Sequence, residues 1–156
     1  MENLIEKLSE QQMLYLLWVT IMNQSQKSSE VIKNVKLLIE RIGNKEYNNL
    51  TYNEIACIIN STPKLHRFPN MMSKYIYDSI LTINNVFLGN IKNVFSYETV
   101  YNNLLIFKGI SEHKAEMCLG VIYCLVNNCI ELGIFRGCNL SEEVLMDELD
   151  IINSLA

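Results

Sequence analysis

Helix-start signals recur along this chain, and they leave little room for any regular element other than a short helix. Ser9-x-x-Gln12 and Thr51-x-x-Glu54 are capping boxes, in which two side chains exchange hydrogen bonds with the first turn of a helix. Apolar residues at helical spacing follow each box, and no stretch alternates apolar and polar residues as a strand does. The pattern therefore predicts an all-α chain.

The remaining start and stop signals divide the chain into about eight short helices. Gly43 is placed to end one of them, and a polar loop is expected over residues 84–93. We see no repeat, linker or low-complexity tract, so residues 1–156 are expected to form a single domain, a compact orthogonal array of helices. The other expected helix starts are Ser28, Pro69, Ser96, Ser111 and Ser141.

Composition and charge indicate a globular protein, with 49% hydrophobic and 19% charged residues. A net charge of -4 argues against indiscriminate binding to nucleic acid, although two local basic clusters stand out. No secretory signal is visible, and the uncharged apolar run over residues 117–130 is too short to cross a membrane. We therefore expect an intracellular protein, in cytoplasm or nucleus, without membrane contact. The clusters are Lys64, His66, Arg67 and Lys74, and Lys108, His113, Lys114 and Arg136.

The five cysteines are an odd number without a small disulfide framework, which favours reduced thiols. Two interpretations of the last four stay open. Four thiolates would suffice for zinc or an iron–sulfur cluster, but no Cys-x-x-Cys pair is present. Buried structural thiols are favoured, and no metal site is expected, because free cysteine is among the most buried residue types. The four residues are Cys118, Cys124, Cys129 and Cys138.

A glycine turn lies between two apolar helical runs near residue 109. Gly109 supplies a positive φ, Ile110 is expected to point inward, and Ser111 is expected to cap the next helix. Backbone amides at that helix N-terminus suit a phosphate, and Lys108 and Lys114 add positive charge. An ordinary helical hairpin without a ligand would have the same pattern.

Two blocks around this turn resemble the helix-hairpin-helix DNA glycosylase superfamily, which contains endonuclease III and the adenine glycosylases. The family motif reads roughly L-P-G-V-G-x-K-T-A, then a helix, then V-D-T-H-I-F-R-V-x-N. Here residues 107–115 read FKGISEHKA and residues 130–139 read IELGIFRGCN, and no gap is needed between the blocks. The resemblance implies a helix-hairpin-helix motif over about residues 97–127, within a glycosylase-like helical barrel.

An earlier segment, residues 16–26, resembles the family helix that ends in a Gln-containing turn at the DNA and the active-site cleft. By this resemblance Gln24 and Gln26 would contact DNA, together with the hairpin residues named above. Hairpins of the family grip a phosphate through backbone amides and often a monovalent cation through carbonyls. The implied partner is double-stranded DNA.

The departures from the family motif fall on its catalytic positions. Bifunctional relatives attack the sugar with a lysine, and the aligned residue here is His113, whose imidazole cannot form a Schiff base. Lys114 follows, but its side chain is rotated by about 100° and should point elsewhere. The family aspartate, which stabilises the developing sugar cation, is Glu131 here, and Gly133 replaces a histidine. The resemblance therefore implies a single-function DNA N-glycosylase, a hydrolase that flips a damaged or mismatched base, with Glu131 and His113 as its catalytic residues.

The short chain implies a reduced second domain. Relatives build their cleft between the barrel and a domain made from both termini, but here only residues 1–9 and 140–156 remain for it. The iron–sulfur cluster motif of endonuclease III is absent, so we expect no cofactor beyond a monovalent cation at the hairpin. Ser111 also replaces the second glycine of the hairpin, where a left-handed conformation would be strained.

Two other functions stay open. A glycosylase-fold chain that has lost catalysis would serve as a scaffold that binds DNA or protein, and the acidic balance favours a protein. Apolar surface left bare by the reduced second domain would then be covered by that partner or by a second copy, as a homodimer. An unrelated small helical regulator would also fit the composition, but it leaves the two gap-free blocks unexplained.

Overall fold

A computed structural model describes residues 5–127 and 141–156, and this part of the chain is all-helical. The prediction of an all-α chain is therefore confirmed, with seven α-helices and two short 3-10 helices in the described ranges. The 3-10 helices are Tyr47–Asn49 and Ile91–Asn93. The α-helices are α2 (Glu10–Met22), α3 (Ser28–Ile42), α4 (Tyr52–Asn60), α5 (Pro69–Val86), α6 (Val100–Leu104), α7 (Glu112–Asn127) and α8 (Glu142–Ser154).

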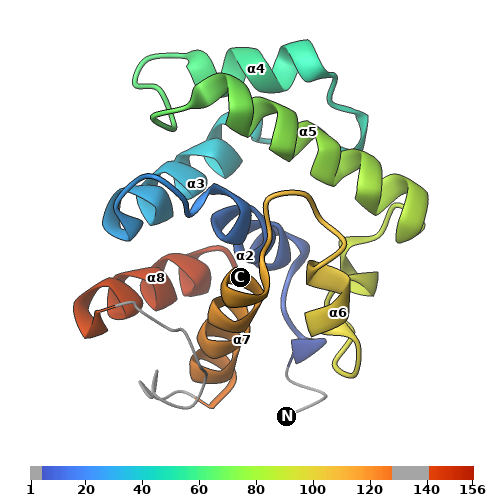
Figure 1. Ribbon diagram of the computed structural model, residues 1–156, viewed down its shortest axis with the longest axis vertical. Coiled ribbons are helices and arrows are strands. Elements are labelled where there is room, and N and C mark those ends of the chain that lie inside the picture. Colours follow the sequence, from blue (N-terminus) through green and yellow to red (C-terminus); the bar gives the residue numbers. More distant parts are fainter. Residues whose placement is uncertain (1–4, 128–140) are drawn as a thin grey trace.

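Helix α2 lies at the centre of the molecule, and the other long helices surround it (Figure 1). Every residue from Gln12 to Met22 is buried, so α2 forms the middle of the core rather than one wall of it. Helices α3, α5, α7 and α8 all pack against it. Although α2 is buried on all sides, neither it nor any other described helix is long and apolar enough to span a membrane.

The single tryptophan, Trp18, lies in the middle of α2 and is fully buried. Its Nε1 donates to Oγ of Ser79 in α5 at 3.0 Å, which gives the buried indole N–H the partner it needs. Its ring meets the ring of Tyr47 edge-on, with the centroids 6.4 Å apart. The tryptophan therefore joins α2 to α5 and to the first 3-10 helix.

The last helix is fastened to the start of α2. Oγ of Ser9 donates to the carbonyl oxygen of Leu155 at 3.1 Å, and Nε2 of the buried Gln12 donates to that of Ile152 at 3.0 Å. Leu145 and Ile152 of α8 belong to the same hydrophobic core as α2. Helix α8 therefore adds to one core instead of forming a core of its own.

Helix signals whose partners lie within one turn are confirmed. Both capping boxes form: the hydroxyls of Ser9 and Thr51 accept the backbone N–H groups three residues on, at 3.1 and 3.2 Å. Pro69 is the first residue of α5, and Gly43 follows α3 with a φ of +59°. Hydrogen bonds of this range depend on local sequence alone.

Two predicted boundaries are wrong. Helix α6 begins at Val100, later than the start predicted from Ser96, which lies in a turn. Helix α5 continues to Val86, into the predicted loop. There Asn84 exchanges hydrogen bonds with Asn48, at 2.8 and 3.0 Å, and these contacts between distant parts of the chain hold the last turn in helical form.

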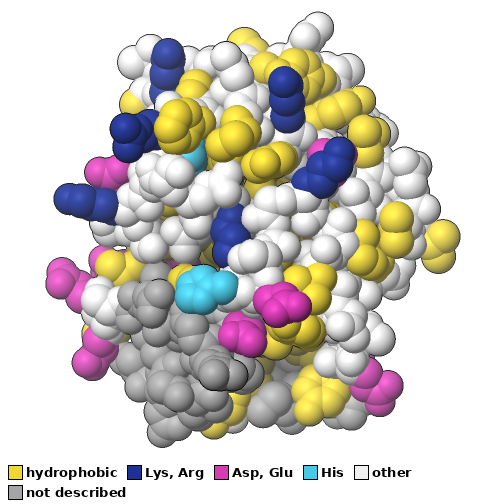
Figure 2. Space-filling view, in the orientation of Figure 1, with side chains coloured by type: hydrophobic (Ala, Val, Ile, Leu, Met, Phe, Trp, Pro, Cys, Tyr) yellow, Lys and Arg dark blue, Asp and Glu magenta, His cyan; other side chains and the backbone are white. Residues whose placement is uncertain are grey.

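Charge is divided unevenly over the fold. Residues 27–92 carry nine Lys and Arg against five Asp and Glu, whereas residues 93–156 carry three against nine. Figure 2 shows the result on one face: Lys and Arg side chains gather over the upper half, around α3, α4 and α5, and acidic side chains lie mostly below. One half of the molecule is therefore basic although the net charge of the chain is negative.

Candidate functional site

The hairpin between α6 and α7 packs tightly against α5. Gly109 has a φ of +89°, and a Cβ at this position would lie 3.2 Å from Cδ2 of Tyr75. Ile110 is buried, and Oγ of Ser111 accepts the backbone N–H of Lys114 at 3.3 Å, which caps α7. Ser111 is not left-handed, so the strain expected from its replacement of a glycine does not arise.

The two lysines of the hairpin point in different directions. Lys108 is 71% exposed, and its Nζ lies 3.6 Å from Oδ1 of Asp78 in α5. Lys114 turns inward, and its Nζ donates to the carbonyl oxygens of Gly109 at 2.6 Å and Ile21 at 2.8 Å. Burial lowers the pKa of this amine to about 8, while the two carbonyl oxygens favour its charged form. One hairpin carbonyl is therefore already bound to a cation that the chain itself supplies.

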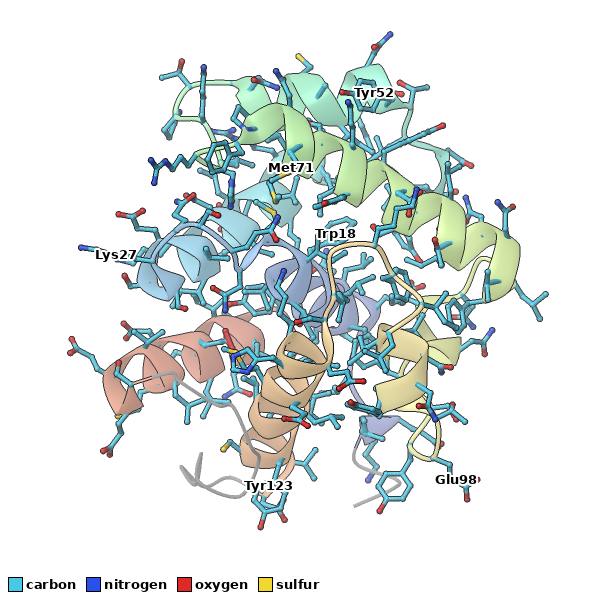
Figure 3. All side chains as sticks on the ribbon, viewed as in Figure 1. Trp18, Lys27, Tyr52, Met71, Glu98 and Tyr123 are labelled. Atoms are coloured by element: carbon cyan, nitrogen blue, oxygen red, sulfur yellow. The ribbon has the colours of Figure 1, made fainter. Side chains whose placement is uncertain are left out.

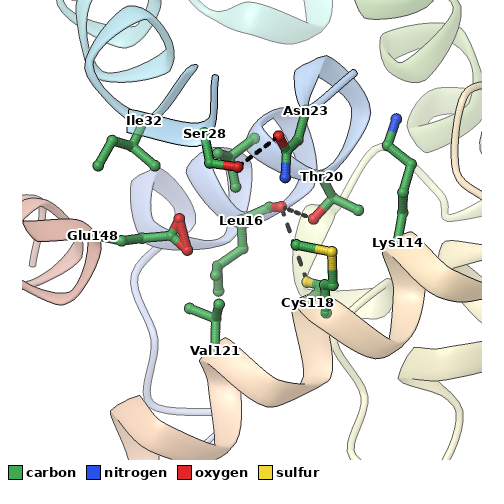
Figure 4. A pocket seen from close by; sticks show the side chains of 11 residues that line it. Leu16, Thr20, Asn23, Ser28, Ile32, Lys114, Cys118, Val121 and Glu148 are labelled. Carbon is green, nitrogen blue, oxygen red and sulfur yellow. Dashed lines mark hydrogen bonds between the residues drawn. The ribbon is translucent and has the colours of Figure 1, made fainter. Parts of the chain in front are cut away.

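A small pocket lies beneath the hairpin, between α2, α3, α7 and α8 (Figure 4). Its volume is about 30 Å³, which is room for a few water molecules. Figure 4 shows Lys114 and Glu148 on opposite sides of this space, with Thr20 and Cys118 between them. The other described lining residues are Leu16, Val19, Asn23, Ser28, Ile32, Met117 and Val121.

Glu148 brings a buried carboxyl from α8 into this pocket. It is 3% exposed, and burial raises its pKa to about 7 because an ionised carboxylate would lose its hydration there. The hydroxyl of Tyr15 is buried beside this carboxyl, and burial first, then the nearby Glu148 charge, raises the pKa of that tyrosine. Burial also raises the pKa of the Cys118 thiol to about 12. The Glu148 carboxyl thus titrates near neutral pH, whereas the neighbouring Tyr15 hydroxyl and Cys118 thiol do not.

Only one of the two predicted catalytic residues lies in the described part of the chain. His113 is exposed on the first turn of α7 and is not among the described residues that line the pocket. Glu131 lies outside the described residues, as does Gly133, so the spatial relation of Glu131 to His113 stays a prediction. The rotation of about 100° between neighbouring helix positions turns Lys114, not His113, toward the pocket.

His66 organises the turn in which DNA contacts were predicted. Its buried ring uses Nε2 to donate to the carbonyl oxygens of Met22 at 3.0 Å and Gln24 at 3.1 Å. Its Nδ1 accepts the backbone N–H of Phe68 at 3.0 Å. These partners require the neutral ring with its proton on Nε2, and burial accordingly lowers the pKa of His66. In the sequence His66 belongs to a basic cluster, and no local pattern signals that it joins two loops.

Gln26 is bound at both ends of its amide. Its Oε1 accepts the backbone N–H of Arg67 at 3.0 Å, and its Nε2 donates to Oε2 of Glu30 at 3.1 Å. A contact of this amide with DNA would require one of these bonds to break. The neighbouring Gln24 is half-buried, with its carbonyl held by His66.

The cysteines divide by burial. Cys118 and Cys124 are buried free thiols, and Cys57 is an exposed one. Cys129 and Cys138 lie outside the described residues, so the alternative of four thiolate ligands is not tested. Within residues 5–127 and 141–156, no group of three or more His, Cys, Asp and Glu side chains is arranged to hold a metal.

Comparisons with family models, curated proteins and solved structures find no match to this chain. The described residues, 5–127 and 141–156, define the class of the fold as all-α. The glycosylase resemblance rests on the sequence blocks around the hairpin.

Proposed function

We propose that this protein binds double-stranded DNA through its hairpin and removes a damaged or mismatched base as a single-function N-glycosylase. The observation that carries the proposal is the pocket behind the hairpin, where Lys114 has a lowered pKa and Glu148 a raised one. Buried titratable groups whose pKa values are shifted and that line one cavity are typical of functional sites. The basic half of the surface supports DNA as the partner.

In this proposal Glu148 is the general acid. A carboxyl with a pKa of about 7 is partly protonated at neutral pH and can protonate a ring nitrogen of the departing base. The electron pair of the glycosidic bond leaves with the base, and water adds to C1′ of the sugar. Glu131 keeps the role that the resemblance gives it, which is to stabilise the sugar cation and activate the water. His113, exposed near the hairpin, would contact the DNA backbone.

The position of Lys114 supports hydrolysis over a Schiff-base mechanism. Its Nζ donates to two carbonyl oxygens, and an ammonium in that position has no lone pair with which to attack C1′. Both acceptors are backbone atoms that hold the hairpin to α2. We therefore assign Lys114 the role of positioning the hairpin.

A nucleobase does not fit the pocket as it stands. A volume of about 30 Å³ accommodates water, and a base is several times larger. The proposal therefore requires the helices around the pocket to separate when a base leaves the duplex.

Excision assays on a panel of lesion-containing and mismatched duplexes test the proposal. The wild-type protein should release a base, and Glu131→Gln and Glu148→Gln should each abolish or strongly reduce release. Glu143→Gln, which removes an exposed carboxylate from α8, is the matched control and should act like wild type. Borohydride should trap no protein–DNA adduct. A wild-type protein that is inert on the whole panel contradicts the excision proposal, and a trapped adduct contradicts hydrolysis.

A scaffold function is the second candidate, and an apolar groove favours it. The groove has a volume of about 430 Å³ and lies between residues 97–101 and the outer face of α7. Such a surface suits an apolar segment of a partner protein. Failure to bind a duplex with an abasic-site analogue, combined with a stable dimer in solution, would favour this function over DNA repair. Ile5, Val100, Tyr101, Leu119, Ile122 and Val126 supply most of its apolar lining.

A further inference from the structure

Two loops on the basic half of the molecule are fastened into one unit, which we call the loop junction: residues 23–27 and residues 61–68. His66 and Gln26 join the loops through the hydrogen bonds described above. Arg41 of α3 holds the start of the second loop, since its guanidinium donates to the carbonyl oxygens of Ser61 at 3.2 Å and Pro63 at 2.9 Å. The loop junction is therefore a built surface rather than two independent loops.

An aromatic ring stands exposed at the edge of the loop junction. Phe68, the residue before α5, is 42% exposed although it is bound through its backbone to His66. The guanidinium carbon of Arg67 lies 5.5 Å from the centroid of the Phe68 ring, a cation–π contact. Met71, one helical turn further along α5, is 38% exposed and extends the apolar surface. Exposed apolar side chains that are rimmed by polar residues are typical of interaction sites.

Positive charge surrounds this ring. Exposed Lys27, Lys64 and Arg67 belong to the loop junction, and exposed Lys74 lies in the second turn of α5. The first three line an open hollow of about 470 Å³, in which the acidic residue is Glu30, already bound to Gln26. Figure 2 shows apolar side chains among Lys and Arg on this part of the face, and Figure 3 labels Lys27 and Met71 there. The surface therefore combines a flat apolar ring with an excess of cations.

We propose that the loop junction binds an unpaired nucleobase of a DNA strand, which stacks on Phe68 while the surrounding Lys and Arg side chains hold the flanking phosphates. Bases stack on aromatic side chains, and a cationic rim supplies the charge complementarity that a strand requires. A paired base inside a duplex has both faces covered by its neighbours, so the exposed ring fits an unpaired base. This inference rests on the DNA-binding part of the proposed function and not on base removal.

A single-stranded thymidine oligonucleotide with one 2-aminopurine tests the inference, because stacking quenches the fluorescence of that base. Wild type should bind and quench it. Phe68→Ala should bind about tenfold more weakly, with little quenching. Leu81→Ala is the matched control, since Leu81 lies on α5 and its exposed fraction of 38% is close to the 42% of Phe68; it should act like wild type. For charge, Lys64→Gln should weaken binding, and Lys92→Gln, exposed but outside the loop junction, should not.

Each outcome decides a separate point. Equal binding and quenching by Phe68→Ala and Leu81→Ala would overturn the inference. Wild type that binds a duplex with an abasic-site analogue but no single strand would overturn it too, while the DNA-binding proposal would stand. A wild-type protein that binds neither the duplex nor the single strand would overturn both this inference and the DNA-binding proposal. Because Phe68 is exposed, its alanine variant should melt at the wild-type temperature, which separates a defect in stacking from a defect in folding.

Discussion

At the scale of single residues, Glu148 couples the stability of the protein to pH. Its pKa is about 7 in the folded state, against an ordinary value of 4.5, so the folded protein binds this proton more tightly than the unfolded chain does. The stabilisation is complete below pH 4.5 and is lost as the pH rises through about 7. Above that pH the native state holds a buried carboxylate with no salt bridge among the described residues.

We predict that Glu148→Gln stabilises the protein at pH 8 and has little effect near pH 4.5. The amide cannot ionise, so the variant avoids a cost on the order of 3 kcal/mol at pH 8. Urea unfolding of wild type and variant at the two pH values measures this difference. For the control Glu143→Gln, the difference from wild type in the free energy of unfolding should be the same at both pH values. A gain for Glu148→Gln that does not depend on pH would contradict the assignment.

At the scale of elements, the hairpin joins three helices through few atoms. The Gly109 turn lies against Tyr75 of α5, and Lys114 of α7 donates to the carbonyl oxygen of Ile21 in α2. No side chain larger than hydrogen fits at the turn without moving Tyr75, and the positive φ disfavours any other residue. The geometry of the proposed phosphate grip therefore depends on one glycine.

We predict that Gly109→Ala destabilises the protein by about 2 kcal/mol, of which roughly 1 kcal/mol comes from the left-handed backbone. It should also weaken binding to a duplex with an abasic-site analogue. Gly89→Ala is the control: its φ is +74°, but a Cβ there meets nothing closer than 3.8 Å. Thermal melts and binding isotherms of both variants separate the effects. If Gly89→Ala weakened DNA binding as much as Gly109→Ala, the hairpin would not be the grip.

The helices also show which features of this structure can be predicted from the sequence and which cannot. Capping by Ser9 and Thr51 was predictable because each partner lies three residues away. The extension of α5 was not, because Asn84 depends on a distant asparagine. The inward turn of Lys114 and the burial of Glu148 likewise follow from how helices pack, and no local pattern distinguishes Glu148 from its exposed acidic neighbours.

At the scale of the complete fold, the uneven distribution of charge matters more for DNA binding than the net charge does. Residues 27–92 carry the excess of Lys and Arg, while α8 carries five acidic residues and no basic one. The exposed acidic side chains of α8 would repel DNA from the outer face of that helix, so the protein should approach DNA with its basic half.

We predict that affinity for duplex DNA falls steeply with salt in spite of the net negative charge. Replacing Lys64 and Lys74 together with Gln should flatten the plot of log affinity against log salt by up to about 0.9 for each phosphate that the variant no longer neutralises. Replacing Glu142 and Glu143 together with Gln should leave the slope unchanged. A salt-independent affinity, or equal slopes for both double variants, would show that the basic half does not meet DNA.

The central tryptophan gives these experiments an internal optical reporter. With one indole in the chain, and that indole dry and bonded to Ser79, native emission should be blue-shifted and poorly quenched by acrylamide. Loosening of α2 from α5 would shift the spectrum to the red without any attached dye. Tryptophan fluorescence can therefore report whether each variant is folded, in the same sample that is used for its assay.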